Sequence, residues 1–279
     1  MKRSNKLLII TAILGLLIPI LIVTIASAVA PKVPQQQLST EELIRTRKYT
    51  DEISGFSKIP LKSAFKTITL LGTRNLYIEI YLIKSNDAGI RVKSNMQKNI
   101  TTKIEANGQL LITVNGALEE EQNGQYGGII AIYGKQISDI TLNKAEGISI
   151  VTKQDSLVLN GNDVGRITLQ GYQSIYKKNE GVNFISGNQI KHIVAHLKNS
   201  HLIADQISCE SMNLDVRQSS IELTGNRSFS DIQNLMVKTN GPSGLNIEKT
   251  NIKSISGQIS DSTILTVPTP YLKQLFQNK

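Results

Sequence analysis

Apolar and polar residues alternate in short runs through most of the chain after residue 56. The stretch "ISDITLNKAEGISI", residues 137–150, holds two such runs with a small polar interruption between them. Alternation with a period of two predicts half-buried β-strands, because successive side chains of a strand point to opposite faces. This part of the sequence has no 3.6-residue period of useful length, so it predicts an all-β domain.

The spacing of the apolar residues also recurs at longer range. Ile137, Ile140 and Leu142 form an I-x-x-I-x-L unit. Comparable units follow at Val164, Ile167, Leu169; at Ile190, Ile193, Ala195; at Ile207, Met212, Leu214; at Ile232, Leu235, Val237; and at Ile252, Ile255, Gly257. The six starts span residues 137 to 252, so five intervals over 115 residues give a period of about 23 residues.

A repeat of about 20 residues that carries two or three short strands is typical of a parallel β-helix, or β-solenoid. We therefore predict a β-solenoid of about six coils over residues 53–267, including an N-terminal strand layer through which the chain enters the coils. A β-sandwich is the competing architecture, because it also uses short strands and turns rich in Gly and Asn.

Turn residues are abundant, with 22 Asn and 20 Gly in 279 residues. Asn-Gly occurs five times, at positions 107, 115, 123, 160 and 240. Asn107-Gly108 lies between two apolar runs, and this dipeptide is the commonest sequence for a tight hairpin turn. We expect a hairpin there.

The N-terminus carries Lys2, Arg3 and Lys6, and no residue from Leu7 to Pro31 is charged. Such a stretch is long enough to cross a bilayer as a helix, which takes about 20 residues. We predict a transmembrane signal-anchor helix over 7–30, with a cytoplasmic tail at 1–6 and everything after the helix on the other side of the membrane. A cleavable signal peptide is the alternative, because "ASA" at 26–28 resembles a cleavage site.

Two further segments flank the predicted domain. Residues 31–52 are expected to be a linker or stalk with a short helix near 40–48, since Ser39 and Glu42 match a capping box. Residues 268–279 are expected to be a C-terminal cap or a frayed tail. As a cap, this segment would cover the last coil with Tyr271, Leu272, Leu275 and Phe276.

The net charge of +9 comes from 31 Lys and Arg against 22 Asp and Glu, and only 5% of the residues are aromatic. Lys and Arg are scattered along the chain and are not interleaved with aromatic residues. Nucleic-acid-binding proteins usually cluster their basic residues. The charge therefore indicates a solvated surface with mild affinity for anionic surfaces, and no nucleic-acid partner.

The histidines and one acidic run invite a metal site. His192, His196 and His201 lie within ten residues, but their segment predicts strand, turn and strand. On a strand, His192 and His196 would be about 13 Å apart, too far for one ion. The run Glu119–Glu121 is expected to be a solvated loop. Cys209, the single cysteine, excludes an intramolecular disulfide and is expected to be a small buried hydrophobe.

Parallel β-helices also include polysaccharide lyases and hydrolases, which need paired carboxylates or a base beside calcium ligands. The aspartates of the repeat region are spread singly, at 139, 155, 163, 205, 215, 231 and 261. We predict no catalytic residue, no cofactor and no metal ligand. A carbohydrate-active enzyme remains the alternative function.

Two segments resemble a known family. "DEISGFSKIPLKSAFKTITLLG" at 51–72 and "IIAIYGKQISDITLNKAEGISIV" at 129–151 are similar to the head-GIN-domain family of putative autotransporter adhesins. The family's coils usually carry Ser-Gly-Ala-type turns, whereas this chain has "NKAEG" and "TGNRS". The resemblance implies a β-helical, surface-exposed domain and supplies no catalytic residues.

Together these features predict a single-pass membrane protein with a cytoplasmic N-terminus and a periplasmic or extracellular main domain. It is expected to act by non-enzymatic, adhesin-like binding or as a structural element. Its partners would be the membrane, through the N-terminal helix, and glycans or envelope proteins, through outward Asn, Gln, Ser and Lys side chains. A third hypothesis for its function is a sensor or scaffold that acts through its short cytoplasmic end.

Overall fold

The computed structural model describes residues 40–72, 76–115, 127–177, 181–186, 188–226 and 230–277. The compact unit that carries the sheets begins at Leu43, ten residues before the predicted start of the domain. Within the described ranges, no helix is both long enough and apolar enough to cross a membrane. The predicted anchor at 7–30 lies outside these ranges.

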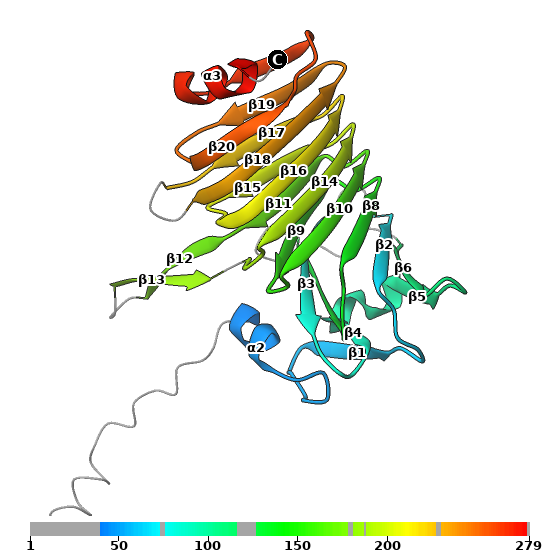
Figure 1. Ribbon diagram of the computed structural model, residues 1–279. Coiled ribbons are helices and arrows are strands. Elements are labelled where there is room, and N and C mark those ends of the chain that lie inside the picture. Colours follow the sequence, from blue (N-terminus) through cyan, green and yellow to red (C-terminus); the bar gives the residue numbers. More distant parts are fainter. Residues whose placement is uncertain are drawn as a thin grey trace, which may run out of the picture. The chain divides into compact units, whose positions relative to one another are not determined.

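The unit is mostly β and contains two large mixed sheets with many parallel strands (Figure 1). The nine-stranded sheet has the order β20-β18-β16-β14-β10-β8-β2-β6-β5. Its strands in chain order are β2 Thr67–Leu71, β5 Ile100–Ile104, β6 Gln109–Val114, β8 Asp139–Asn143, β10 Ser156–Asn162, β14 His192–Lys198, β16 Cys209–Arg217, β18 Asp231–Asn240 and β20 Asn251–Gln258.

The ten-stranded sheet has the order β1-β4-β7-β3-β9-β11-β15-β17-β19-β21. Its strands are β1 Phe56–Pro60, β3 Tyr77–Lys84, β4 Gly89–Lys93, β7 Gly128–Gly134, β9 Gly147–Thr152, β11 Arg166–Gln170, β15 His201–Asp205, β17 Ser220–Thr224, β19 Ser243–Ile247 and β21 Thr263–Thr266. A separate antiparallel pair, β12 Tyr172–Lys177 and β13 Gly181–Ser186, forms a third sheet.

From β8 onward the chain alternates between the two large sheets. We call one strand of the nine-stranded sheet together with the following strand of the ten-stranded sheet a rung. Six rungs follow one another: β8–β9, β10–β11, β14–β15, β16–β17, β18–β19 and β20–β21. Every strand in a rung pairs in parallel with its equivalent in the next rung. A sandwich built of hairpins would pair these strands antiparallel.

The N-terminal strands are not stacked in chain order. The pair β2–β3 lies between β6–β7 and β8–β9, and its strands are parallel to both neighbours. Antiparallel strands follow on the far side of β6 and β7, namely β5 in one sheet and β4 and β1 in the other. The predicted hairpin at Asn107-Gly108 joins β5 to β6, and Gly108 has the positive φ of +77° that its turn requires.

One apolar core lies between the two large sheets. In the nine-stranded sheet a column of register partners points inward, formed by Ile140, Leu159, Ala195, Leu214 and Val237. All five residues are buried in one continuous apolar cluster. Burying an aliphatic side chain of the size of Ile or Leu stabilises a fold by about 1.5–3 kcal/mol. The alternation seen in the sequence is thus the alternation between this core and solvent.

The repeat is less regular than its mean period implies. One column of the nine-stranded sheet consists of four successive register partners, His192, Ser211, Asn234 and Ser254. More residues of the chain separate Ser211 from Asn234 than separate the partners of the other two pairs. Ser156 and His192 are partners much farther apart in the chain, because the β12–β13 hairpin is inserted between their rungs. The insertion lengthens the mean spacing.

One predicted repeat unit lies in the other sheet. Ile167 and Leu169 belong to β11 of the ten-stranded sheet, whereas the other five units lie in β8, β14, β16, β18 and β20 of the nine-stranded sheet or at their starts. Leu157 and Leu159 of β10 occupy the expected place. The prediction was wrong here because strands of both sheets bury every second residue.

The turns also differ from the simplest expectation. Four residues that are not glycine have positive φ at the turns from the nine-stranded to the ten-stranded sheet: Lys144, Asp163, Asn199 and Gln218. Asn160-Gly161 is not a turn but lies inside β10. A Cβ on Gly161 would be 2.7 Å from Ile167 Cδ1, so this glycine makes room for the core.

Among the residues that the structure describes, three helical segments accompany the sheets: α2 Thr40–Thr46, the 3-10 helix η1 Ser94–Asn99 and α3 Thr269–Gln277. Helix α3 lies against β20 (Figure 1). The Tyr271 hydroxyl accepts a hydrogen bond from Ile252 N (3.0 Å) and donates one to Thr250 O (3.2 Å), and Gln274 Oε1 accepts one from Ile255 N (3.0 Å). These side chains pair backbone groups at the exposed edge of β20.

Candidate functional site

The outer side of the nine-stranded sheet presents rows of polar side chains in register across the stacked rungs. We call this surface the polar sheet face. It consists of two columns, Thr141, Asn160, His196, Asp215 and Lys238, and Asn143, Asn162, Lys198, Arg217 and Asn240. These positions are half-buried or exposed and alternate with buried core residues.

Side-chain hydrogen bonds run between rungs on this face. Asn162 Nδ2 donates to Asn143 Oδ1 at 3.0 Å, and Asn160 Nδ2 donates to Thr141 Oγ1 at 3.4 Å. Such bonds between neighbouring strands hold the side chains in fixed positions. Amide and hydroxyl groups held in this way can both donate to and accept from the hydroxyls of a ligand.

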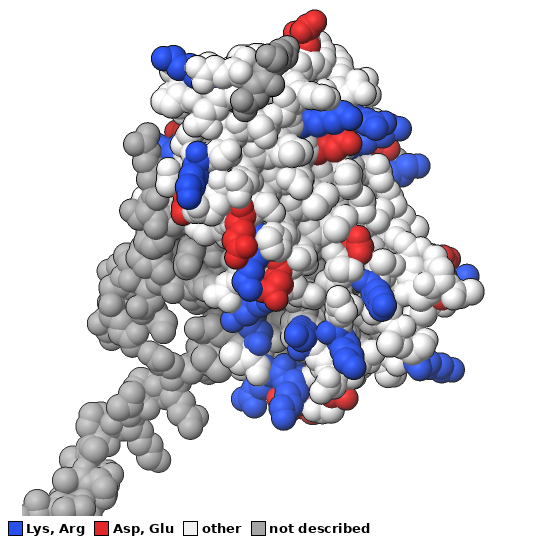
Figure 2. All heavy atoms as spheres, viewed as in Figure 1, with Lys and Arg blue, Asp and Glu red and all other residues white. Residues whose placement is uncertain are grey.

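A shallow hollow of about 400 Å³ lies on the polar sheet face, lined mainly by Thr141, Asn160, Asn162, His196, Lys198, Asp215 and Arg217. Asp215 and His196 face each other, with 3.9 Å between Oδ2 and Nδ1. The hollow therefore offers amides, a carboxylate and cations within one region. Figure 2 shows acidic and basic side chains scattered over much of the visible surface, with Lys and Arg gathered toward its lower end.

A third column of the same sheet is partly apolar. It contains Val158, Val194 and Met236, with Asp139 and Asn213 among them in register. Met236 is 53% exposed. The outer side of the sheet thus combines a partly apolar column with polar columns beside it.

The histidines lie on two sheets. His192 and His196 point outward from β14, as expected for a strand, while His201 lies on β15 of the other sheet. Each faces a carboxylate of the following rung: Glu210 at 3.8 Å, Asp215 at 3.9 Å and Glu222 at 3.4 Å, respectively. The described part of the chain contains no group of three or more His, Cys, Asp or Glu that could hold a metal ion.

Several carboxylates bind polar side chains of a neighbouring rung. Asp163 Oδ1 accepts from Asn199 Nδ2 at 2.9 Å, Asp231 Oδ1 accepts from Asn251 Nδ2 at 3.0 Å, and Asp205 Oδ1 accepts from the Thr224 hydroxyl at 3.2 Å. These contacts tie successive rungs together. The run Glu119–Glu121 lies outside the described residues.

Cys209 is buried at the start of β16 and belongs to the core, as expected. Burial and, to a lesser degree, the charge of Asp231 raise the pKa of its thiol to about 12. The thiolate is the reactive form of cysteine, so this side chain is chemically inert in the folded protein near neutral pH.

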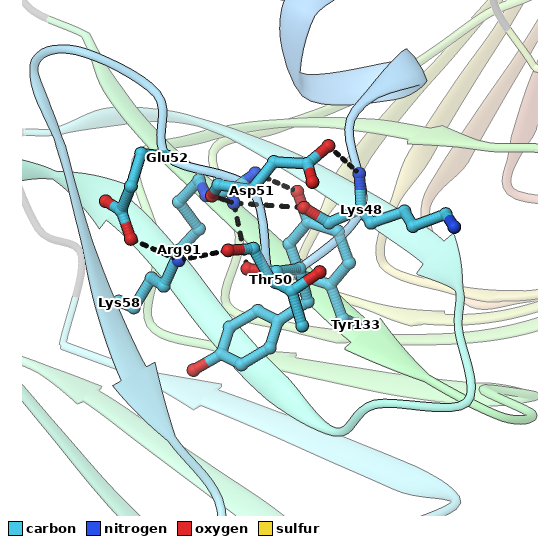
Figure 3. A network of polar contacts seen from close by, with 8 residues as sticks. Lys48, Thr50, Asp51, Glu52, Lys58, Arg91 and Tyr133 are labelled. Atoms are coloured by element: carbon cyan, nitrogen blue, oxygen red, sulfur yellow. Dashed lines mark hydrogen bonds and ion pairs between the residues drawn. The ribbon is translucent and has the colours of Figure 1, made fainter.

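A buried arginine that the sequence did not reveal joins the segment after α2 to the ten-stranded sheet (Figure 3). Arg91 of β4 is 1% exposed. Its Nη2 donates to the carbonyl oxygens of Lys48 (3.1 Å), Tyr49 (3.0 Å) and Asp51 (2.6 Å), and its Nη1 donates to the Tyr133 hydroxyl (2.7 Å). The buried charge is therefore compensated by oriented carbonyl dipoles.

A small second apolar cluster lies beside this arginine, on the outer side of β3, β7 and β9. Ile44 of α2 is fully buried there with Tyr81, Ala131, Tyr133 and Val151. Burial raises the pKa of Tyr133, while the nearby Arg91 charge acts in the opposite direction. Residues from Ile44 to Asp51 thus pack on the sheet, although the sequence predicted a linker up to residue 52.

No family model matches this chain, and no curated protein sequence is significantly similar to it. Solved structures are similar at low identity. A putative adhesin from Parabacteroides merdae is 13% identical, with a TM-score of 0.41, over 76% of this chain and 92% of that one. A putative lipid binding protein from Parabacteroides distasonis is 14% identical, with a TM-score of 0.38, over 76% and 94%.

A putative adhesin from Bacteroides fragilis is 10% identical, with a TM-score of 0.39, over 75% of this chain and 94% of that one. Two of these three structures are named putative adhesins, as is the family that residues 51–72 and 129–151 resemble. At these identities and TM-scores, the likeness gives no information about what this chain binds.

Proposed function

We propose that this chain is a membrane-anchored, envelope-facing β-solenoid that binds a glycan or another envelope protein and catalyses no reaction. The solenoid is supported by the six consecutive rungs, each paired in parallel with the next. It is also supported by the single apolar cluster that runs through all of them. Each rung is then one coil of two strands, and β2–β3 and β6–β7 add two further coils out of chain order.

The anchor is residues 7–30, which lie within a stretch that carries no charge. The compact unit begins at Leu43, so only about 12 residues separate the two. Twelve extended residues reach at most roughly 40 Å. In this proposal the residues before Leu7 are cytoplasmic, and the β-rich unit lies on the other side of the membrane.

The polar sheet face carries the proposed binding role. Because neighbouring strands are about 4.8 Å apart, successive side chains within each polar column repeat at about this spacing. The partly apolar column with Val158, Val194 and Met236 runs beside them. A sugar ring also has both apolar C–H faces and polar hydroxyls at its edge. In this proposal Asn160 and His196, which line the hollow, bond such hydroxyls, while Val158 and Val194, two positions earlier on the same strands, contact the ring.

A glycan array tests this proposal directly. The full chain, reconstituted in phosphatidylcholine nanodiscs, is expected to bind a defined set of glycans. The double variant Asn160→Ala/His196→Ala should lower the affinity by at least about tenfold, which corresponds to about 1.4 kcal/mol. The matched control is Thr168→Ala/Asn246→Ala, which removes outward polar side chains from the ten-stranded sheet and should leave binding unchanged.

The proposal fails if neither a glycan nor an envelope extract yields a ligand, or if both double variants lose binding equally. Release of sugar fragments from any bound glycan would instead support the alternative, a carbohydrate-active enzyme on the same scaffold.

A further inference from the structure

Three neighbouring strands of the ten-stranded sheet each bring a lysine to the same edge. Strands β7, β3 and β9 are adjacent. Lys84 is the last residue of β3 and pairs with Gly134, so Lys135 follows one position later on β7. Thr152 of β9 pairs with Leu82, and Lys153 follows it. Adjacent strands are about 4.8 Å apart, so the three lysines form a ladder that spans about 10 Å.

A fourth lysine joins this ladder from the segment before β2. Lys66 lies beside the turn that leads into β8, where its carbonyl oxygen accepts a hydrogen bond from Ser138 N at 3.2 Å. Lys66, Lys84, Lys135 and Lys153 line one hollow of about 580 Å³. We call these four residues and the hollow the lysine groove.

Within the described residues, the positive charge of the lysine groove is balanced only in part, by Asp155, whose pKa the nearby Lys84 charge helps to lower. All four lysines are exposed, and none forms an ion pair with a described carboxylate. Asp155 is the one acidic residue in the described wall of the hollow, and it is bound to Lys191 of the next rung at 3.0 Å. That pairing also lowers the pKa of Asp155.

Like charges on neighbouring strands repel each other and destabilise the sheet. The groove therefore keeps an unfavourable arrangement that a bound anion would relieve. Basic residues are in excess in the part of the chain that contains the groove. The described residues between 43 and 160 include 14 Lys and Arg against 8 Asp and Glu. Those between 161 and 277 include nine Lys and Arg against eight Asp and Glu.

A side-chain amide in the groove wall supplies a second observation. Gln154 Oε1 accepts a hydrogen bond from Ile137 N at 3.2 Å, which fixes the orientation of the amide. Its Nε2 is buried and has no acceptor among the described residues. A buried donor without an acceptor is unfavourable, and an oxygen of a bound ligand would satisfy it.

We propose that the lysine groove binds a linear polymer that carries phosphate groups. A single phosphate carries only about two negative charges against the four lysines, whereas successive phosphates of a chain can meet successive lysines of the ladder. Lysine binds phosphate oxygens as a compact point charge, without the rigid fork that arginine presents to carboxylates and phosphates alike, and no arginine lies in the described groove wall. This site and its ligand are separate from the polar sheet face.

The test uses the full chain in phosphatidylcholine nanodiscs and fluorescently labelled inorganic polyphosphate, with binding followed by anisotropy. The variant Lys84→Glu/Lys135→Glu is compared with Lys253→Glu/Lys273→Glu, which makes the same change of charge at two exposed lysines of β20 and α3. We expect the groove variant to lose at least about tenfold in affinity and the control less than about twofold. Binding by the unchanged protein should weaken as salt is added.

Equal losses in the two variants would overturn the proposal, because they would show attraction by net charge alone. Binding of a polyuronate as tight as that of polyphosphate would overturn the choice of phosphate. A second experiment uses nanodiscs that contain phosphatidylglycerol and measures how fast the four lysines are acetylated. If these nanodiscs protect the lysines and polyphosphate does not bind, the groove binds a lipid headgroup and the polymer proposal is contradicted. Lys84→Gln/Lys135→Gln should also lose affinity while keeping the unfolding midpoint, which excludes misfolding as the cause.

The outcome is independent of the proposed glycan binding. The groove variants leave the polar sheet face unchanged, so glycan-array binding should persist in Lys84→Glu/Lys135→Glu whether or not polyphosphate binding is lost.

Discussion

The Arg91 guanidinium donates a hydrogen bond to the Tyr133 hydroxyl at 2.7 Å and lies 5.3 Å from the centroid of the same ring. Around this pair, the carbonyl oxygens of residues 48, 49 and 51 complete the coordination of the buried cation. Arg91 therefore holds the segment that leads from α2 to β1 against the ten-stranded sheet.

Replacing Arg91 by Met should destabilise the fold by about 3 kcal/mol, because several buried hydrogen-bond acceptors lose their donor at once. Urea unfolding measures this loss. Amide hydrogen exchange should become faster over residues 47–52. Arg166→Met is the control, since Arg166 is exposed at the start of β11. Equal stability of the two variants would show that Arg91 does not hold the segment.

Because the rungs are closely stacked, we expect the substitution of Gly165 by alanine to lower the stability of the fold. A Cβ at this position would lie 2.6 Å from Glu146 O, a backbone atom of the neighbouring rung. Gly165→Ala should therefore destabilise the protein by about 1–3 kcal/mol, since two backbones must move apart. At Gly127 no described atom lies within 4 Å of the added Cβ, so Gly127→Ala should be nearly neutral. Thermal unfolding of both variants checks this, and equal midpoints would contradict the close approach.

The buried thiol predicts how stability depends on pH. The pKa of Cys209 is about 12 in the folded protein, against 9.0 for an exposed thiol. Below pH 9 both states keep the proton. Above it the unfolded chain loses the proton first, so stability falls as the pH rises. Relative to Cys209→Ala, the unchanged protein should lose about 2 kcal/mol between about pH 8 and about pH 10.5. A pH-independent difference between the two unfolding curves would contradict the burial.

The contacts of α3 predict self-association when they are removed. Tyr271 and Gln274 satisfy backbone groups of β20, and an uncovered strand edge can pair with another copy of the chain. Tyr271→Phe/Gln274→Leu should lose about 1–2 kcal/mol and form dimers or larger species. Lys273→Ala, at an exposed position of the same helix, should do neither. Light scattering after size-exclusion chromatography separates these outcomes.

The strands were predictable because a half-buried strand imposes a period of two. Ile140 and Leu142 are buried as their alternation requires. Which sheet a strand joins was not predictable, since strands of both sheets bury every second residue. Leu169 therefore looked equivalent to Leu142, although it lies in the ten-stranded sheet. Local sequence also does not encode the position of β2–β3 between β6–β7 and β8–β9, which depends on contacts between distant residues.

The two charged features were hidden for a related reason. Arg91 stands in an ordinary strand pattern, and its burial is made favourable by the carbonyl oxygens of residues 48, 49 and 51 and by the Tyr133 hydroxyl. Lys66 and Lys153 are far apart in the sequence and resembled scattered charges, until the register of the strands placed them around one hollow. The polar columns were easier to predict from the sequence, because outward Asn and Lys positions follow directly from the alternation.

The distance between Asp139 and Ser256 tests the stacked winding most directly. These residues begin and end one column of register partners that crosses β8, β10, β14, β16, β18 and β20. Spin labels at these two positions, in the Cys209→Ala background, should give one narrow distribution centred at about 24 Å, because five strand spacings separate them. A distribution centred beyond about 40 Å, or one without a defined maximum, would contradict the parallel stack.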